Sequence, residues 1–164
     1  RGSAAAFCAA MGEMGSRRSD LGEMFRAATL RDLRDRGHEI GLQGARKDPH
    51  AARRTPACFE AELTADIERL ARLGCGRALA SYRHGEGRVA AHERRTVAAV
   101  FSLGFGGRRG INRGRCDRAQ LASVPLGPSP ADRDRAAAVL AACLASKGWL
   151  IFTASDVSDT PSRT

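Results

Sequence analysis

Short apolar runs and amphipathic segments alternate along this chain. The apolar runs predict strands at residues 4–10, 38–43, 78–82, 104–111, 121–124 and 149–152. The amphipathic segments, whose apolar residues recur at helical spacing, predict helices at residues 20–36, 56–73, 90–103 and 131–147. Strands that alternate with helices, without internal repeats, favour a parallel α/β architecture in one domain spanning residues 1–164.

Turn and capping residues bound several of these helices. Asp20 to Glu23 has the form of a capping box, which predicts a helix start. Thr55 before Pro56 predicts a second start, with Thr55 as the N-cap and Pro56 in the first turn. Gly37 and Gly74 are placed to end helices, because glycine adopts the left-handed conformation without a Cβ penalty.

The apolar positions also predict which faces are buried. The inward faces of the four helices are expected to carry Met24, Ala27, Leu30 and Leu33; Phe59, Leu63, Ile67 and Leu70; Val97, Val100 and Phe101; and Val139, Leu140, Cys143 and Leu144. Trp149 to Phe152 is a continuous apolar run, which is typical of a strand covered on both faces. Leu121 to Val124 is interpreted as a short edge element.

The segment from Arg36 to Gln43 joins a predicted helix end to a predicted strand. In parallel α/β folds, ligands bind at the carboxyl ends of the strands. Gln43 and the loop after it are therefore the first place to expect function.

The chain carries a net charge of +9 and has a pI near 10.5, which favours anionic partners. Arginine supplies almost all of the positive charge, because Lys47 and Lys147 are the only lysines. Six Phe, one Tyr and one Trp are few for stacking nucleic-acid bases, so a nucleic-acid partner is disfavoured. No apolar stretch is long enough to span a membrane, and none has the form of a signal peptide.

The cysteines predict a cellular location, and the first residue predicts a truncation. An odd number of cysteines without C-x-x-C spacing predicts reduced, mostly buried thiols and a cytoplasmic location: Cys8, Cys58, Cys75, Cys116 and Cys143. The chain begins at Arg1 rather than Met, and we interpret it as truncated at its amino end.

Four segments carry a resemblance to a known family. The run from Arg36 to Gly41, Arg-Gly-His-Glu-Ile-Gly, is similar to the second motif of the polysaccharide deacetylases (carbohydrate esterase family 4). Ala80 to Glu86 is similar to the third motif, Phe105 to Ile111 to a segment of some branches, and Gly148 to Val157 to the fifth motif. Their order and spacing match across nearly all of the chain. The resemblance implies a parallel sheet that closes as a distorted, incomplete (β/α) barrel, with the first-motif strand upstream of Arg1.

The resemblance also implies a reaction, the metal-dependent hydrolysis of N- or O-acetyl groups on a glycan. In active members one Asp and two His hold a divalent metal, usually zinc, a second Asp is the general base, and the fifth-motif His is the general acid. Zinc with three protein ligands leaves a fourth position for water, whose pKa falls toward about 7. An imidazole can then protonate the departing amine.

This chain departs from the family pattern at each of those positions. Gln43 and Lys47 stand where the second motif has its two His, and Ser155 stands where the fifth motif has its acid His. A neutral amide is a poor zinc ligand, a lysine brings a like charge toward the cation, and a hydroxyl does not shuttle protons at neutral pH. Arg83 and His84 replace a Pro and an aromatic residue of the third motif. We therefore expect a catalytically impaired or inactive domain, with no confident metal ligand.

Other residues at predicted strand ends remain candidates. The resemblance points to carbohydrate binding through Tyr82, His84, Gly85, Glu86 and Asp156. A displaced metal site from His50 and His84 with Asp48, Glu86 or Asp156 is a further alternative. We interpret His38 as structural and His92 as solvent-exposed on a charged helix start.

A second function class rests on a basic segment. Its arginines alternate with Gly106, Gly107, Gly110 and Gly114, and Asp117 is its only acid: Arg108, Arg109, Arg113, Arg115 and Arg118. Glycine-rich backbone with arginines can hold phosphate or carboxylate groups. The alternative function is therefore a basic module that binds an anionic polymer through this segment, against the simpler interpretation of a solvated loop. The particular sugar and the oligomeric state are left open by the sequence.

Overall fold

The structure is a computed structural model that describes residues 3–18, 22–44, 54–75, 80–85 and 89–154. The strands are β1 (Ala6–Ala9), β2 (Arg17–Arg18), β3 (Gly22–Glu23), β4 (Glu39–Gln43), β5 (Ser81–Arg83), β6 (Leu103–Arg109), β7 (Leu121–Pro125) and β8 (Phe152–Thr153). The helices are a 3-10 turn η1 (Met11–Glu13), α1 (Ala27–Asp35), α2 (Pro56–Arg72), α3 (Ala91–Val100) and α4 (Pro130–Ala145).

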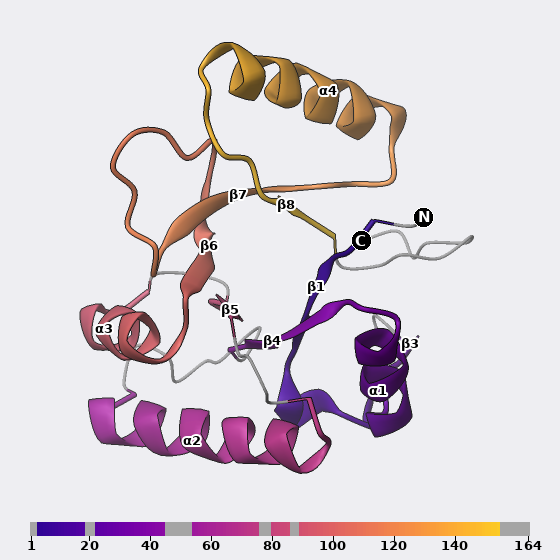
Figure 1. The fold of residues 1–164 in the computed structure, drawn as a ribbon, viewed down its shortest axis with the longest axis vertical. Helices are drawn as coiled ribbons and strands as arrows, with labels where there is room; N and C mark the ends of the chain where they lie inside the picture. Colours follow the sequence, from indigo (N-terminus) through magenta and orange to yellow (C-terminus); the bar gives the residue numbers. More distant parts are fainter. Residues whose placement is uncertain (1–2, 19–21, 45–53, 76–79, 86–88, 155–164) are drawn as a thin grey trace.

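Six of the strands form one parallel sheet in the order β1-β4-β5-β6-β7-β8. The sheet curls into a half-barrel, and the helices lie around its outer side (Figure 1). β2 and β3 form a separate antiparallel pair. The predicted fold class, an α/β parallel sheet closing as a distorted, incomplete (β/α) barrel, is thus confirmed.

Glycine sets the spacing in the first half of the sheet. Gly41 of β4 lies between β1 and β5 and pairs in register with Cys8. With no side chain at Gly41, the Cys8 Sγ and the Ser81 Oγ come within 3.9 Å of each other across the strand. A Cβ at this position would lie 2.6 Å from the Ser81 carbonyl oxygen and 3.2 Å from the Cys8 Sγ.

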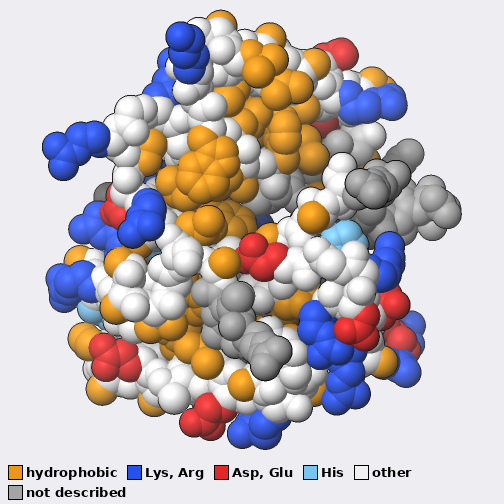
Figure 2. All heavy atoms as spheres, in the orientation of Figure 1, with side chains coloured by type: hydrophobic (Ala, Val, Ile, Leu, Met, Phe, Trp, Pro, Cys, Tyr) orange, Lys and Arg blue, Asp and Glu red, His pale blue; other side chains and the backbone are white. Residues whose placement is uncertain are grey.

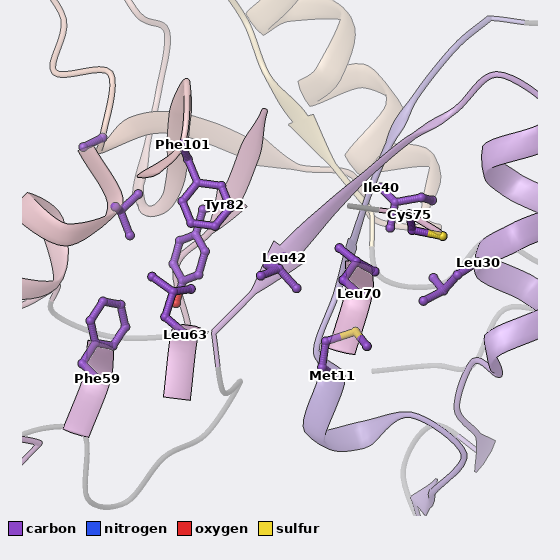
Figure 3. Packing of buried hydrophobic residues seen from close by; sticks show 13 residues of the cluster. Met11, Leu30, Ile40, Leu42, Phe59, Leu63, Leu70, Cys75, Tyr82 and Phe101 are labelled. Carbon is purple, nitrogen blue, oxygen red and sulfur yellow. The ribbon is translucent and has the colours of Figure 1, made fainter. Parts of the chain in front are cut away.

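The hydrophobic core lies between the sheet and helices α1, α2 and α3. Leu30 of α1, Leu70 of α2 and Val97 of α3 are buried against Ile40 and Leu42 of β4 and their neighbours. Figure 3 shows Leu30, Leu42, Leu63 and Leu70 converging in this cluster. The inward face predicted for α2 is confirmed, since Phe59, Leu63 and Leu70 are buried and Ile67 packs against them.

Of the two helix starts that the sequence predicts, one is confirmed and one is wrong. Thr55 accepts a hydrogen bond from the Cys58 amide and Pro56 occupies the first turn, as predicted. The helix start expected at Asp20 to Glu23 is wrong, because Gly22 and Glu23 pair as β3 and α1 begins at Ala27. Gly22 adopts a φ of 77°, which a helix excludes, and Glu23 forms an ion pair with Arg26 at 3.0 Å instead.

The carboxyl-terminal third is more exposed than its apolar pattern predicts. On α4, Cys143 is buried but Leu140 and Leu144 are 46% and 71% exposed, so the inward stripe is wrong for both leucines. The strand expected to be covered on both faces is reduced to the edge strand β8, and Trp149 and Phe152 are exposed. A continuous hydrophobic area extends over α4 and below it (Figure 2).

Three smaller expectations also fail. Val100 is 45% exposed, because α3 ends there and the chain turns extended at Phe101, which is buried. β7 is an interior strand between β6 and β8 rather than an edge element. Cys75 and Cys143 are buried, as expected, whereas Cys58 and Cys116 are exposed.

No helix in the described residues is long and apolar enough to cross a membrane.

Candidate functional site at the carboxyl ends of β4 and β5

β4 and β5 end side by side. Gln43 and Arg83 are partners in the register of the two strands, and the Gly44 amide donates a hydrogen bond to the Arg83 carbonyl at 3.0 Å. Because both strands are parallel, their carboxyl ends meet at one edge of the sheet. This is the edge at which the sequence predicts function.

The Gln43 side chain is already engaged at this edge. The Arg83 guanidinium donates from Nη1 to the Gln43 Oε1 at 3.0 Å. The amide oxygen is the atom of Gln43 that would ligate a cation, and it lies against a permanent positive charge. Among the described residues no group of three or more His, Cys, Asp or Glu side chains is arranged to hold a metal ion.

A pocket opens between the ends of β1, β4 and β5 and the first turns of α2. Its volume is about 270 Å³. That volume is close to the lower end of the range for small-molecule sites, about 300–1,000 Å³. Backbone and apolar side chains form most of its wall, and four polar side chains reach it: Gln43, Arg54, Glu62 and Asp66. Tyr82 completes the wall.

The charges at the pocket come mainly from α2. Arg54 precedes this helix and lies 3.4 Å from the Glu62 carboxylate and 3.5 Å from the Glu93 carboxylate. Its guanidinium also stands over the Phe59 ring, 5.8 Å from the ring centroid. Asp66 lies one turn beyond Glu62. Its pKa is raised above the ordinary value chiefly by burial, with Arg69 opposing and Glu62 adding to the rise.

Tyr82 is a core residue whose hydroxyl reaches the pocket. The side chain is 4% exposed, and its ring packs at 5.2 Å from Phe101 and 6.4 Å from Phe59. In Figure 3 the hydroxyl points toward Leu63 of α2, which also lines the pocket. Burial raises the pKa of the hydroxyl, and Glu93 adds to this effect, so the group is protonated at neutral pH.

His84 is turned into the protein. It is 5% exposed, and its Nε2 lies 2.6 Å from the Ala119 carbonyl oxygen. Burial lowers the pKa of the imidazole below the ordinary value of histidine, although the Ala119 carbonyl opposes this shift. A neutral ring that donates from Nε2 ties β5 to the residues before β7. Gly85 follows it at the strand end and is half-buried.

The remaining predicted site residues lie outside the described part of the chain. These are Lys47, Asp48, His50, Glu86, Ser155 and Asp156. Carbohydrate binding through Tyr82, His84, Gly85, Glu86 and Asp156 therefore stays a prediction. The displaced metal site with His50 also stays untested.

The predictions for His38 and His92 have different outcomes. His38 has a structural place, because its Nδ1 accepts a hydrogen bond from the Ala5 amide at 3.3 Å and its ring packs on Phe7. His92 was expected to be solvent-exposed, which is wrong for the tip of its ring. The Nε2 atom is buried, has no hydrogen-bond partner within the described ranges, and lies beside the Phe59 ring.

The basic segment begins at the end of β6 and leads to β7. Its five arginines are exposed and form no ion pair with any described residue: Arg108, Arg109, Arg113, Arg115 and Arg118. Asp117, the only acid among them, is directed toward α3 and pairs with Arg94 at 3.0 Å. The segment is anchored by Asn112, whose Nδ2 donates to the Ala122 carbonyl at 2.9 Å. It is a structured loop rather than a purely solvated one.

The pocket residues Arg54, Glu62 and Asp66 were missed by the sequence reasoning. The pattern did contain a signal. Glu62 and Asp66 stand one helical turn apart. Glu62 is next to the buried Leu63, and Asp66 is next to Ile67, which is partly buried and packs against the core. Charged residues at the border of an apolar stripe occur in most amphipathic helices, so this signal alone does not separate a pocket from a solvated face.

No family model, no curated protein and no solved structure matches this chain.

Proposed function

We propose that this chain is a polysaccharide deacetylase-like domain that binds a glycan without carrying out metal-dependent deacetylation. The hydrogen bond from Arg83 to Gln43 carries the proposal. In the family that Arg36 to Gly41 resembles, a metal-binding His stands at the position of Gln43.

The guanidinium of Arg83 opposes a cation at this position. Two like unit charges about 4 Å apart repel by roughly 4 kcal/mol at an effective dielectric of 20, and a divalent ion doubles the charge that is repelled. The amide oxygen of Gln43 is also a weaker zinc ligand than an imidazole. These residues do not fit the family's zinc, and no step of a reaction is assigned to it.

The adjacent pocket supports a binding function. Small-molecule sites combine an apolar wall with a few polar groups that fix the orientation of the ligand. Here Phe59 and Leu63 supply apolar wall, while the Tyr82 hydroxyl and the Asp66 carboxylate supply polar groups. A sugar ring presents both kinds of surface, because its C–H groups and its hydroxyls point in different directions.

The experiment measures zinc, acetate and glycan binding on the purified chain. We expect no stoichiometric zinc, no acetate release from acetylated glycan oligomers, and saturable binding of those oligomers. Tyr82→Phe, which keeps the ring and removes the hydroxyl, should weaken binding by about 1 kcal/mol, the value of a typical hydrogen bond. Stoichiometric zinc together with acetate release that is abolished in His50→Ala and His84→Ala would overturn the proposal.

A second candidate function rests on the five exposed arginines of the segment 108–118. Because Asp117 is paired with Arg94, these arginines are not neutralised by the acid nearest to them. An anionic polymer that binds them would release its counterions, so binding should weaken steeply with salt. This would make the chain a basic binding module.

The test uses two variants of equal charge on a heparin column. One variant changes Arg108, Arg109, Arg113, Arg115 and Arg118 to Gln, and the control changes the exposed residues Arg17, Arg31, Arg36, Arg95 and Arg133. Each lowers the net charge from +9 by five, to +4. Earlier elution of the first variant alone would support the module. Equal elution of both would show that retention follows net charge only.

A further inference from the structure

Asp66 is a carboxylate with no partner at the wall of the pocket. It is half-buried, and it forms no hydrogen bond or ion pair with another described residue. Arg54, the cation that lines the pocket, does not pair with Asp66, because it forms ion pairs with Glu62 and Glu93. A partly desolvated carboxylate without a partner is costly for a protein, and a ligand that donates to it recovers that cost.

The Tyr82 hydroxyl is a second polar group without a partner in the same pocket. The side chain is 96% buried, given its exposure of 4%, and no described residue forms a hydrogen bond with its oxygen. Buried tyrosine hydroxyls usually have a partner. This hydroxyl points toward the α2 wall of the pocket (Figure 3). It is independent of the carboxylate, because it comes from β5 and Asp66 from α2.

The unpaired carboxylate of Asp66 favours a cation over a neutral ligand. Arg54 is taken up by Glu62 and Glu93, and Arg83 by Gln43, so neither guanidinium pairs with Asp66. Arg69, beyond Asp66 on α2, offsets its charge in part. The apolar wall of Phe59 and Leu63 requires that the cation be attached to a group with an apolar face.

We propose that this pocket binds an amino sugar with a free amine, whose ammonium group donates to the Asp66 carboxylate while the Tyr82 hydroxyl contacts a neighbouring sugar hydroxyl. The inference rests on the proposed glycan binding and specifies its ligand. Hydrogen bonds between an ammonium and a carboxylate are charge-assisted and stronger than neutral ones. An N-acetylated sugar lacks the charge and leaves Asp66 without a counter-ion.

A metal ion fits the same carboxylate poorly. Zinc requires about three protein ligands and calcium six or more oxygens. Glu62 is already paired with Arg54, so the pocket offers one available carboxylate. An ammonium needs one carboxylate and accepts hydroxyl groups as its other partners.

The experiment compares four ligands by isothermal titration of the full chain at pH 7. These are oligomers of glucosamine, of N-acetylglucosamine and of glucose, equal in length, and 1,4-diaminobutane. We expect the glucosamine oligomer to bind at least tenfold more tightly than the N-acetylated one. Asp66→Asn should remove that preference, whereas the control Glu68→Gln, on the same helix but outside the pocket, should keep it. Thermal unfolding of each variant shows that it is folded.

The outcomes separate this inference from the proposed function. Equal binding of all three oligomers, or a preference that survives Asp66→Asn, would overturn the amino-sugar inference and leave glycan binding intact. Binding of 1,4-diaminobutane without any oligomer would refute both glycan binding and the amino-sugar inference. No binding of any of the four ligands would refute both.

Discussion

Arg83 and Gln43 are joined by a hydrogen bond of 3.0 Å across the ends of two neighbouring parallel strands. The pair occupies the edge of the sheet at which parallel α/β proteins bind their ligands. The Arg83 guanidinium, with five N–H donors and a fixed positive charge, is thereby held at the position where the family that Arg36 to Gly41 resembles has a metal-binding His. The same contact also fastens β4 to β5 beyond their backbone ladder.

Removing the amide should therefore destabilise the fold. We expect Gln43→Ala to lower the free energy of unfolding by about 1.5–3 kcal/mol, because a charged group loses its acceptor in a partly buried place. Chemical denaturation with urea measures this change. Gln120→Ala is the matched control, since the Gln120 side chain has no hydrogen bond to a described residue. A loss no greater than that of the control would contradict the structural role of the pair.

Gly41 gives a sharper test of the sheet. An alanine here would place its Cβ 2.6 Å from the backbone carbonyl of Ser81 and against the Ser81 Oγ. Because the obstacle is backbone, the strands must separate, and we expect Gly41→Ala to cost about 3 kcal/mol or more. Gly12→Ala is the control, as no atom lies within 4 Å of a Cβ at that position. Similar unfolding midpoints for the two variants would show that the close approach of β4 and β5 is not required.

The first half of the chain follows its sequence pattern closely. Thr55 and Pro56 start α2, Phe59, Leu63 and Leu70 face the sheet, and β4 ends at Gln43, as predicted. These features are local, because a cap and a helical spacing act within a few residues. The strand order could also be anticipated, since parallel strands joined through helices tend to lie side by side.

The second half departs from its pattern because burial depends on what packs against each face. The stripe of α4 has helical spacing, yet Leu144 is 71% exposed and only Cys143 is buried. Periodicity reports that a face is apolar and does not report whether a neighbour covers it. The candidate pocket was missed for the same reason. Asp66 and Tyr82 are distant in sequence, and only the packing of α2 on β5 brings them to one cavity.

Substitutions of Leu70 and Leu144 test this difference in burial. Leu70 is completely buried, so Leu70→Ala should cost about 2–5 kcal/mol through lost apolar contact and the cavity left behind. Leu144→Ala removes the same atoms from an exposed position and should change the free energy of unfolding by less than about 0.5 kcal/mol. Urea denaturation of both variants provides the comparison. A large loss for Leu144→Ala would indicate that α4 packs against something in solution.

Cysteine labelling tests the environment of the sheet. Burial raises the pKa of the Cys8 thiol to about 11, although the hydrogen bond with Ser81 opposes the shift. Only the thiolate reacts with iodoacetamide, so at pH 8 a pKa higher by two units lowers the reactive fraction by about 100-fold. We expect mass spectrometry to find the exposed Cys116 alkylated long before Cys8. Equal labelling rates in the folded chain would refute the half-buried position of Cys8. In urea the two rates should become similar, which controls for intrinsic reactivity.

His84 makes a prediction for the dependence of stability on pH. Burial lowers the pKa of its imidazole in the folded chain, while the unfolded chain keeps the ordinary value near 6.5. Between these two values the unfolded state binds more protons than the folded state, so stability falls as the pH falls below about 6.5. One group can contribute at most about 1.4 kcal/mol per pH unit. The free energy of unfolding, measured at pH 7.5 and pH 5.5, should therefore drop less in His84→Gln than in the wild type. Leu144→Ala, which changes an exposed residue without a titrating group, serves as the control, and its drop should match that of the wild type. An unchanged drop in His84→Gln would show that the contact between His84 and Ala119 does not govern the acid sensitivity of the fold.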